Sequence, residues 1–140
     1  MRTVQLDFAD PSFPASLVEV DPPALPADDW ARVEITCGGV CGSDLHLFKP
    51  TTGPTPILGS YVALPMQLGH EIAGRVLETG PACAVPEGTL VAVDPVIGCA
   101  ARGIVPLCAK CASGAASACA HFGSGVRTPG MGLGFTQGLG

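Results

Sequence analysis

Two short polar stretches of the chain hold residue types that can bind a metal and move a proton. The first, Gly39-Val-Cys-Gly-Ser-Asp-Leu-His46, contains a thiol, a hydroxyl, a carboxyl and an imidazole. The second, Gly69-His-Glu71, adds another imidazole and a carboxylate. Thiolate and neutral imidazole are ligands that zinc prefers, and a catalytic zinc has three protein ligands and one open position. The residue types predict a catalytic zinc held by Cys41 and His70, with Glu71 beside the metal.

Asp44 lies between the thiol and the end of the first stretch. A histidine that binds a metal usually donates its other ring nitrogen to a carboxylate, which fixes the orientation of the ring. We therefore expect Asp44 to accept from the His70 imidazole.

A second group of cysteines has the spacing of a structural zinc site. Cys108, Cys111 and Cys119 form a Cys-x2-Cys-x7-Cys pattern, and Cys99 precedes Cys108 by nine residues. Four thiolates around zinc form a closed tetrahedral site that can organise a loop without a core. We expect Cys99 to be the fourth ligand, reached through the looped segment 100–107. The alternatives are a lobe that has lost its metal and a redox-active pair at Cys108 and Cys111.

The other two of the seven cysteines, Cys37 and Cys83, are expected to be structural. The N-terminal sequence lacks the apolar core of a secretory signal. In a chain without a secretory signal, seven cysteines are expected to be metal ligands rather than disulfide partners. We therefore expect a cytoplasmic location.

Composition limits the class of partner. The 140 residues are 47% hydrophobic and 14% charged, which is typical of one folded domain rather than a disordered chain. A net charge of -5, with seven scattered basic residues, argues against a nucleic-acid or anionic-membrane surface. No apolar run reaches the roughly 20 residues that span a bilayer.

The elements that must position these residues are mostly strands. Alternating or continuous apolar patterns predict them at 3–8, 31–36, 71–76 and 89–93. In the first of these, Val4, Leu6 and Phe8 form the apolar face. Turn signals separate the strands, and no segment has the periodicity of a helix longer than a turn or two. The pattern predicts a mainly β fold, a partly open barrel.

The chain changes character after Asp94. Ten of the nineteen glycines lie from Gly98 onward, together with four of the seven cysteines. A long loop without elements of its own must be held by something, be disordered or lack its packing partner. We expect it to be held by zinc, as a lobe at about 95–125. Gly130-Met-Gly-Leu-Gly134 lacks the preceding strand, following helix and downstream acid of a dinucleotide-binding loop. We interpret residues 1–140 as a single, incomplete domain without a cofactor-binding domain.

The two polar stretches together resemble the medium-chain zinc-dependent alcohol dehydrogenases. The pattern Gly-Val-Cys-Gly-Ser-Asp-Leu-His, followed by Gly-His-Glu-x-x-Gly-x-Val, is similar to that of their N-terminal catalytic domain, which has a chaperonin-10-like β-barrel fold. The resemblance extends from Val33 to about Cys119. It implies oxidation of an alcohol to a carbonyl, with zinc acidifying the alcohol and hydride passing to NAD or NADP.

The resemblance also implies a role for each residue of the two stretches. Cys41 and His70 would be ligands of the catalytic zinc, and Glu71 the carboxylate that approaches it during ligand exchange. Asp44 would orient His70. Ser43 would take the alcohol proton and His46 would pass it to solvent through the cofactor ribose, so both would contact substrate or cofactor.

Several family features are missing from the chain. The third catalytic ligand is not identified, the first lobe cysteine of the family is replaced by Val105, and the domain that binds NAD or NADP would follow Gly140. We expect the chain alone to bind structural zinc without reducing the cofactor, and the full-length protein to be a homo-oligomer acting on a small alcohol or aldehyde. The alternative function is a noncatalytic zinc-binding module that keeps the barrel. A zinc-ribbon nucleic-acid binder is disfavoured by the acidic balance.

Overall fold

The computed structural model describes residues 1–7, 15–22, 24–48 and 65–121. Within these residues the chain is mainly β, as the sequence predicts. The elements in chain order are β1 (Arg2–Leu6), β2 (Ala15–Glu19), β3 (Ala31–Gly39), α1 (Gly42–Phe48), β4 (Met66–Gln67), β5 (Glu71–Thr79), β6 (Leu90–Val93), α3 (Ala109–Ala112) and the 3-10 turn η1 (Ala116–Ala118). No helix of the described residues is long and apolar enough to cross a membrane.

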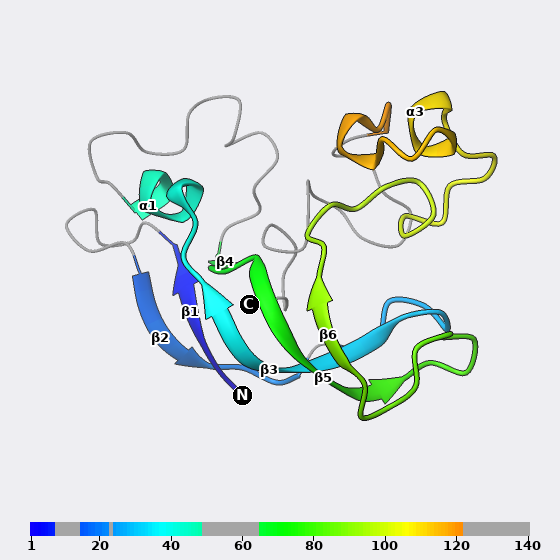
Figure 1. The fold of residues 1–140 in the computed structure, drawn as a ribbon. Coiled ribbons are helices and arrows are strands. Elements are labelled where there is room, and N and C mark those ends of the chain that lie inside the picture. Colours follow the sequence, from blue (N-terminus) through cyan, green and yellow to red (C-terminus); the bar gives the residue numbers. More distant parts are fainter. Residues whose placement is uncertain (8–14, 23, 49–64, 122–140) are drawn as a thin grey trace.

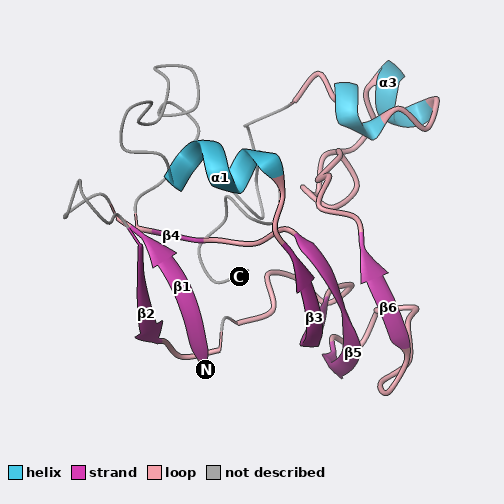
Figure 2. Ribbon diagram, turned by 60° about the vertical axis from the view of Figure 1, so that its left-hand side comes forward, coloured by secondary structure: helices cyan, strands magenta, loops and turns pink. Residues whose placement is uncertain are grey.

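The strands form two antiparallel sheets of three strands each. β1 lies between β2 and β4 in one sheet, and β5 lies between β3 and β6 in the other. The two sheets stay separate in the described part of the chain, as expected for a partly open barrel (Figure 1). Figure 2 shows α1 at the end of the sheets where β3 finishes, and the segment with α3 extending from the corresponding end of β6.

The register of the second sheet brings distant residues to that end. Gly39 of β3 pairs with Glu71 of β5, and Ile72 of β5 pairs with Val93 of β6. These pairings place three segments at the same end of the second sheet: the polar stretch after β3, the residue before β5 and the loop after β6. The sequence predicted that the strand ends at Thr36. It continues to Gly39 because a bulge between Ile35 and Cys37 shifts the register and the pairing then resumes.

The apolar face predicted for the first strand is only partly buried. Leu6 is fully buried and pairs with the buried Ala15, but Val4 is 44% exposed and its cross-strand partner Leu17 is 66% exposed. Thr3, predicted on the outer face, is only 5% exposed. β4 pairs only with the C-terminal end of β1, at Gln5 and Leu6. The ribbon of β1 and β2 therefore extends beyond β4 at the other end, where Val4 and Leu17 lie.

Candidate metal centres

The first candidate centre consists of Cys41, His70 and Glu71, here called the mixed-ligand cluster. One ligand atom from each, a sulfur, a ring nitrogen and a carboxylate oxygen, lies within 4.8 Å of the other two. Cys41 and His70 are partly buried and Glu71 is exposed. Pairing of Gly39 with Glu71 explains the convergence, since Cys41 follows β3 by two residues and His70 immediately precedes β5. The backbone at Gly69 has φ +106°, a left-handed conformation that favours glycine and turns the chain into His70.

Asp44 connects two members of this cluster. Its Oδ2 accepts from the backbone N–H of Cys41 at 2.9 Å, and its Oδ1 lies 3.3 Å from Nδ1 of His70. The first contact is half of a capping box, with Cys41 at the N-cap of α1 and Asp44 three residues later. The second occupies Nδ1, which leaves Nε2 of His70 as the nitrogen for a metal. Asp44 is only 9% exposed, so this bridge is shielded from solvent.

Ser43 and His46 both lie in α1, the helix that begins beside the cluster. Ser43 is exposed near the first turn. The backbone of His46 is helical, but its side chain lies outside the described part of the structure. The roles suggested for these two residues therefore remain predictions.

The second candidate centre is the four-cysteine cluster of Cys99, Cys108, Cys111 and Cys119. Their Sγ atoms all lie within 4.8 Å of one another, and Sγ of Cys99 is 3.6 Å from Sγ of Cys119. Tetrahedral zinc with Zn–S bonds of about 2.3 Å separates its sulfurs by about 3.8 Å. The spacing of the four thiols therefore fits a zinc ion. Cys99, the member with the unusual sequence position, is fully buried.

Every sulfur of the four-cysteine cluster accepts a backbone N–H. The donor–acceptor distances are 3.4–3.5 Å, and the pairs are Cys99 N–H to Cys111, Cys108 N–H to Cys99, Cys111 N–H to Cys108 and His121 N–H to Cys119. Hydrogen bonds of this kind favour the thiolate over the thiol. A group of four sulfurs, two buried and two partly buried and each supplied with a donor, is suited to holding a cation.

The thiols of this cluster share their protons unequally. Backbone N–H groups of Cys111 and Ala120 lower the pKa of Cys108 to about 6. The Cys99 N–H lowers the pKa of Cys111, but burial and the neighbouring thiols outweigh it and raise the value to about 12. The pKa of Cys99 is also raised, because burial and Cys119 outweigh the Cys108 N–H. Without a cation, the cluster therefore loses one proton easily and keeps others.

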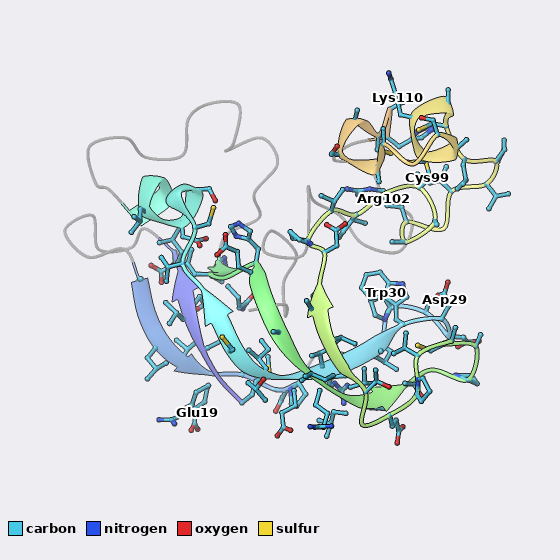
Figure 3. All side chains as sticks on the ribbon, in the orientation of Figure 1. Glu19, Asp29, Trp30, Cys99, Arg102 and Lys110 are labelled. Atoms are coloured by element: carbon cyan, nitrogen blue, oxygen red, sulfur yellow. The ribbon has the colours of Figure 1, made fainter. Side chains whose placement is uncertain are left out.

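Two residues of the lobe and site were not identified from sequence. Arg102 is fully buried in the loop between Cys99 and Cys108, and its Nε donates to the carbonyl oxygen of Ile97 at 3.0 Å (Figure 3). Gly39 lies against the side chain of Glu71. An arginine in a loop, or a glycine at a strand end, gives no sequence signal of this kind. The loop glycines at 130–134 lie outside the described residues.

All seven cysteines are free thiols, including the two outside the clusters. Cys37 is exposed in β3, and Cys83 is partly buried in the turn after β5. Neither belongs to a group of three or more potential ligands among the described residues.

Comparison with known proteins identifies relatives of this arrangement. The chain is 39% identical over 110 residues to a probable zinc-binding alcohol dehydrogenase of Mycobacterium tuberculosis, covering 77% of the chain and 25% of the relative. It is 33% identical over 114 residues to the L-idonate 5-dehydrogenase (NAD(P)(+)) of Escherichia coli, covering 78% and 31%. The crystal structure of galactitol-1-phosphate dehydrogenase from Escherichia coli matches with a TM-score of 0.63 and 29% identity, over 86% of the chain and 30% of that protein.

The chain thus spans between a quarter and a third of the length of these proteins. Residues 27–138 match the family model of the alcohol dehydrogenase GroES-like domain. This range of the chain includes both candidate metal centres. The chain belongs to the family of zinc-dependent alcohol dehydrogenases, through their GroES-like catalytic domain.

Proposed function

We propose that the chain forms the catalytic-domain portion of an alcohol or polyol dehydrogenase, which oxidises an alcohol to a carbonyl by hydride transfer to NAD or NADP. The observation that carries the proposal is the Asp44 carboxylate, which joins the backbone of Cys41 to the ring of His70. A purely structural metal site has no need of an exposed carboxylate such as Glu71 beside its ligands. The names of the relatives, a probable zinc-binding alcohol dehydrogenase and an NAD(P)-dependent idonate dehydrogenase, support the same class.

The mixed-ligand cluster would hold the catalytic zinc through Cys41 and His70. A bound zinc would lower the pKa of an alcohol hydroxyl and polarise the carbonyl product. Asp44 keeps Nδ1 of His70 engaged and so presents Nε2 to the metal. A carboxylate oxygen of Glu71 lies within 4.8 Å of the ligand atoms of Cys41 and His70. Ser43 and His46, both on α1, would carry the alcohol proton away.

The four-cysteine cluster would hold a second zinc with no open position. Its thiolates would stabilise the lobe and take no part in the reaction. The hydrogen bonds from backbone N–H groups to all four sulfurs support this role.

The substrate would be a small alcohol or aldehyde, with neither a nucleic acid nor a membrane as partner. The net charge of -5 supports this choice, since it disfavours binding to phosphate-rich surfaces. Seven free cysteines support a reducing compartment, the cytoplasm. For the full-length enzyme we propose a homo-oligomer.

Metal analysis and kinetics together test the proposal. The purified chain should bind two zinc equivalents, and His70→Ala should remove one while the lobe keeps the other. In the full-length enzyme the same substitution should abolish alcohol-dependent reduction of NAD or NADP. A single zinc equivalent in the unsubstituted chain, unaffected by His70→Ala, would instead favour a noncatalytic zinc module.

A further inference from the structure

We propose that Gly39 is a positioning residue of the mixed-ligand cluster: because it has no side chain, the Glu71 carboxylate can lie beside Cys41 and His70. The inference rests on the proposed function, because it assigns a role within the same metal site. It concerns a residue of the strand that precedes the ligands, and its effect would pass through Glu71 alone.

The geometry of the strand pair carries the inference. Gly39 is the last residue of β3 and pairs directly with Glu71, the first residue of β5. A Cβ at position 39 would lie 3.0 Å from Cβ and 3.2 Å from Cδ of Glu71, and would overlap its Oε2. Directly opposed residues normally keep their Cβ atoms about 4.5–5.5 Å apart. The side chain of Glu71 therefore folds over the backbone of Gly39, through space that any other residue would fill.

The position of the carboxylate depends on that space. A carboxylate oxygen of Glu71 lies within 4.8 Å of the ligand atoms of Cys41 and His70. Any side chain at position 39 would force the carboxylate to rotate away. Since Glu71 is exposed, its flexible end can move into solvent, and the strands then need to separate by only a few tenths of an ångström to relieve the 3.0 Å approach of the two Cβ atoms. The expected consequence is a metal site that has lost its carboxylate within an intact fold.

The neighbouring glycine provides a matched control. A Cβ at Gly38, in the same strand, would meet only the carbonyl oxygen of Glu71, at 3.8 Å, an ordinary contact. At Gly42, on the other side of Cys41, an added Cβ would meet nothing within 4 Å. Substitution by alanine at either position tests the general effect of losing a glycine next to the site.

The experiment is a Co²⁺ titration of the chain with its lobe zinc retained, followed by visible absorption. Gly39→Ala and Glu71→Ala should each weaken Co²⁺ binding at the mixed-ligand cluster by a similar factor, about 10–100-fold. The double variant should be no weaker than either single one, because both remove the same carboxylate. Gly38→Ala and Gly42→Ala should bind like the unsubstituted chain.

Each other outcome has a definite meaning. Unchanged Co²⁺ affinity in Gly39→Ala, or multiplied effects in the double variant, would overturn the inference and leave the proposed function standing. If Gly39→Ala fails to fold, the double variant should fold, since the overlap with the carboxylate of Glu71 is gone and only the 3.0 Å approach of the two Cβ atoms remains; failure of both would overturn the inference. Absence of any Co²⁺ site in the unsubstituted chain would overturn the proposed function itself.

Discussion

Replacing Cys99 with serine should release one of two zinc equivalents and unfold the lobe. Cys99 is fully buried, its Sγ accepts the N–H of Cys108, and it lies 3.6 Å from Sγ of Cys119. A hydroxyl is a poor ligand for zinc, and the affinity of a structural site depends on all its thiolates. Zinc affinity at the lobe should fall by at least about 100-fold. Competition with a chromophoric chelator measures the change.

The lobe has few other sources of stability. Its described helices are one-turn segments, and neither contains a buried residue. The carbonyl oxygen of Cys99 accepts the N–H of Ile104, and Arg102 donates to Ile97, so the loop is anchored around Cys99 itself. A segment with so little apolar burial should lose its order with the metal. Hydrogen exchange should rise across 97–119 while β3 and β5 stay protected.

The matched control is Cys37→Ser, since Cys37 is an exposed cysteine outside both clusters. It should keep both zinc equivalents. If Cys99→Ser also keeps both, with unchanged affinity, then Cys99 is not a ligand. Absence of a lobe zinc from the unsubstituted chain would instead favour a redox-active pair at Cys108 and Cys111.

The strands and the clusters differ in how far sequence could predict them. Alternation predicted β5 well, because Gly74 and Val76 on one of its faces are buried. The continuous apolar run at 89–93 gave the position of β6 but implied burial on both faces, whereas its residues alternate between exposed and partly buried. The predicted end of β3 at Thr36 was wrong. Gly38 and Gly39 have poor strand propensity, and only their pairing with β5 holds them extended. β2 was missed because Ala15–Glu19 has no clean alternation.

The candidate ligands were accessible to sequence analysis because their chemistry is unusual. Thiols and imidazoles at metal-binding spacing stand out in a chain with three histidines. The register that brings Glu71 to Gly39 depends on a bulge, which short-range patterns do not specify. Arg102 and Gly39 were missed for the same reason: each matters through a neighbour that only the folded chain supplies.

Replacing Asp44 with asparagine should weaken metal binding at the mixed-ligand cluster by about 10–100-fold, the usual cost of losing a group that orients a ligand. One oxygen of Asp44 accepts from Cys41 and the other faces Nδ1 of His70. Asparagine has the same shape but only one acceptor oxygen, so one of the two contacts must be lost. Co²⁺ titration with the lobe zinc retained gives the affinity.

A role in capping alone predicts a different result for the same variant. Loss of the contact with the Cys41 N–H would lower the stability of the domain by about 1 kcal/mol while leaving Co²⁺ affinity unchanged. Asp94→Asn is the matched control, because Asp94 accepts the N–H of Val96 at 2.9 Å in an exposed turn. It should leave affinity at the mixed-ligand cluster unaltered. A weaker metal site in Asp44→Asn, with the control unchanged, therefore separates orientation of His70 from stabilisation of α1.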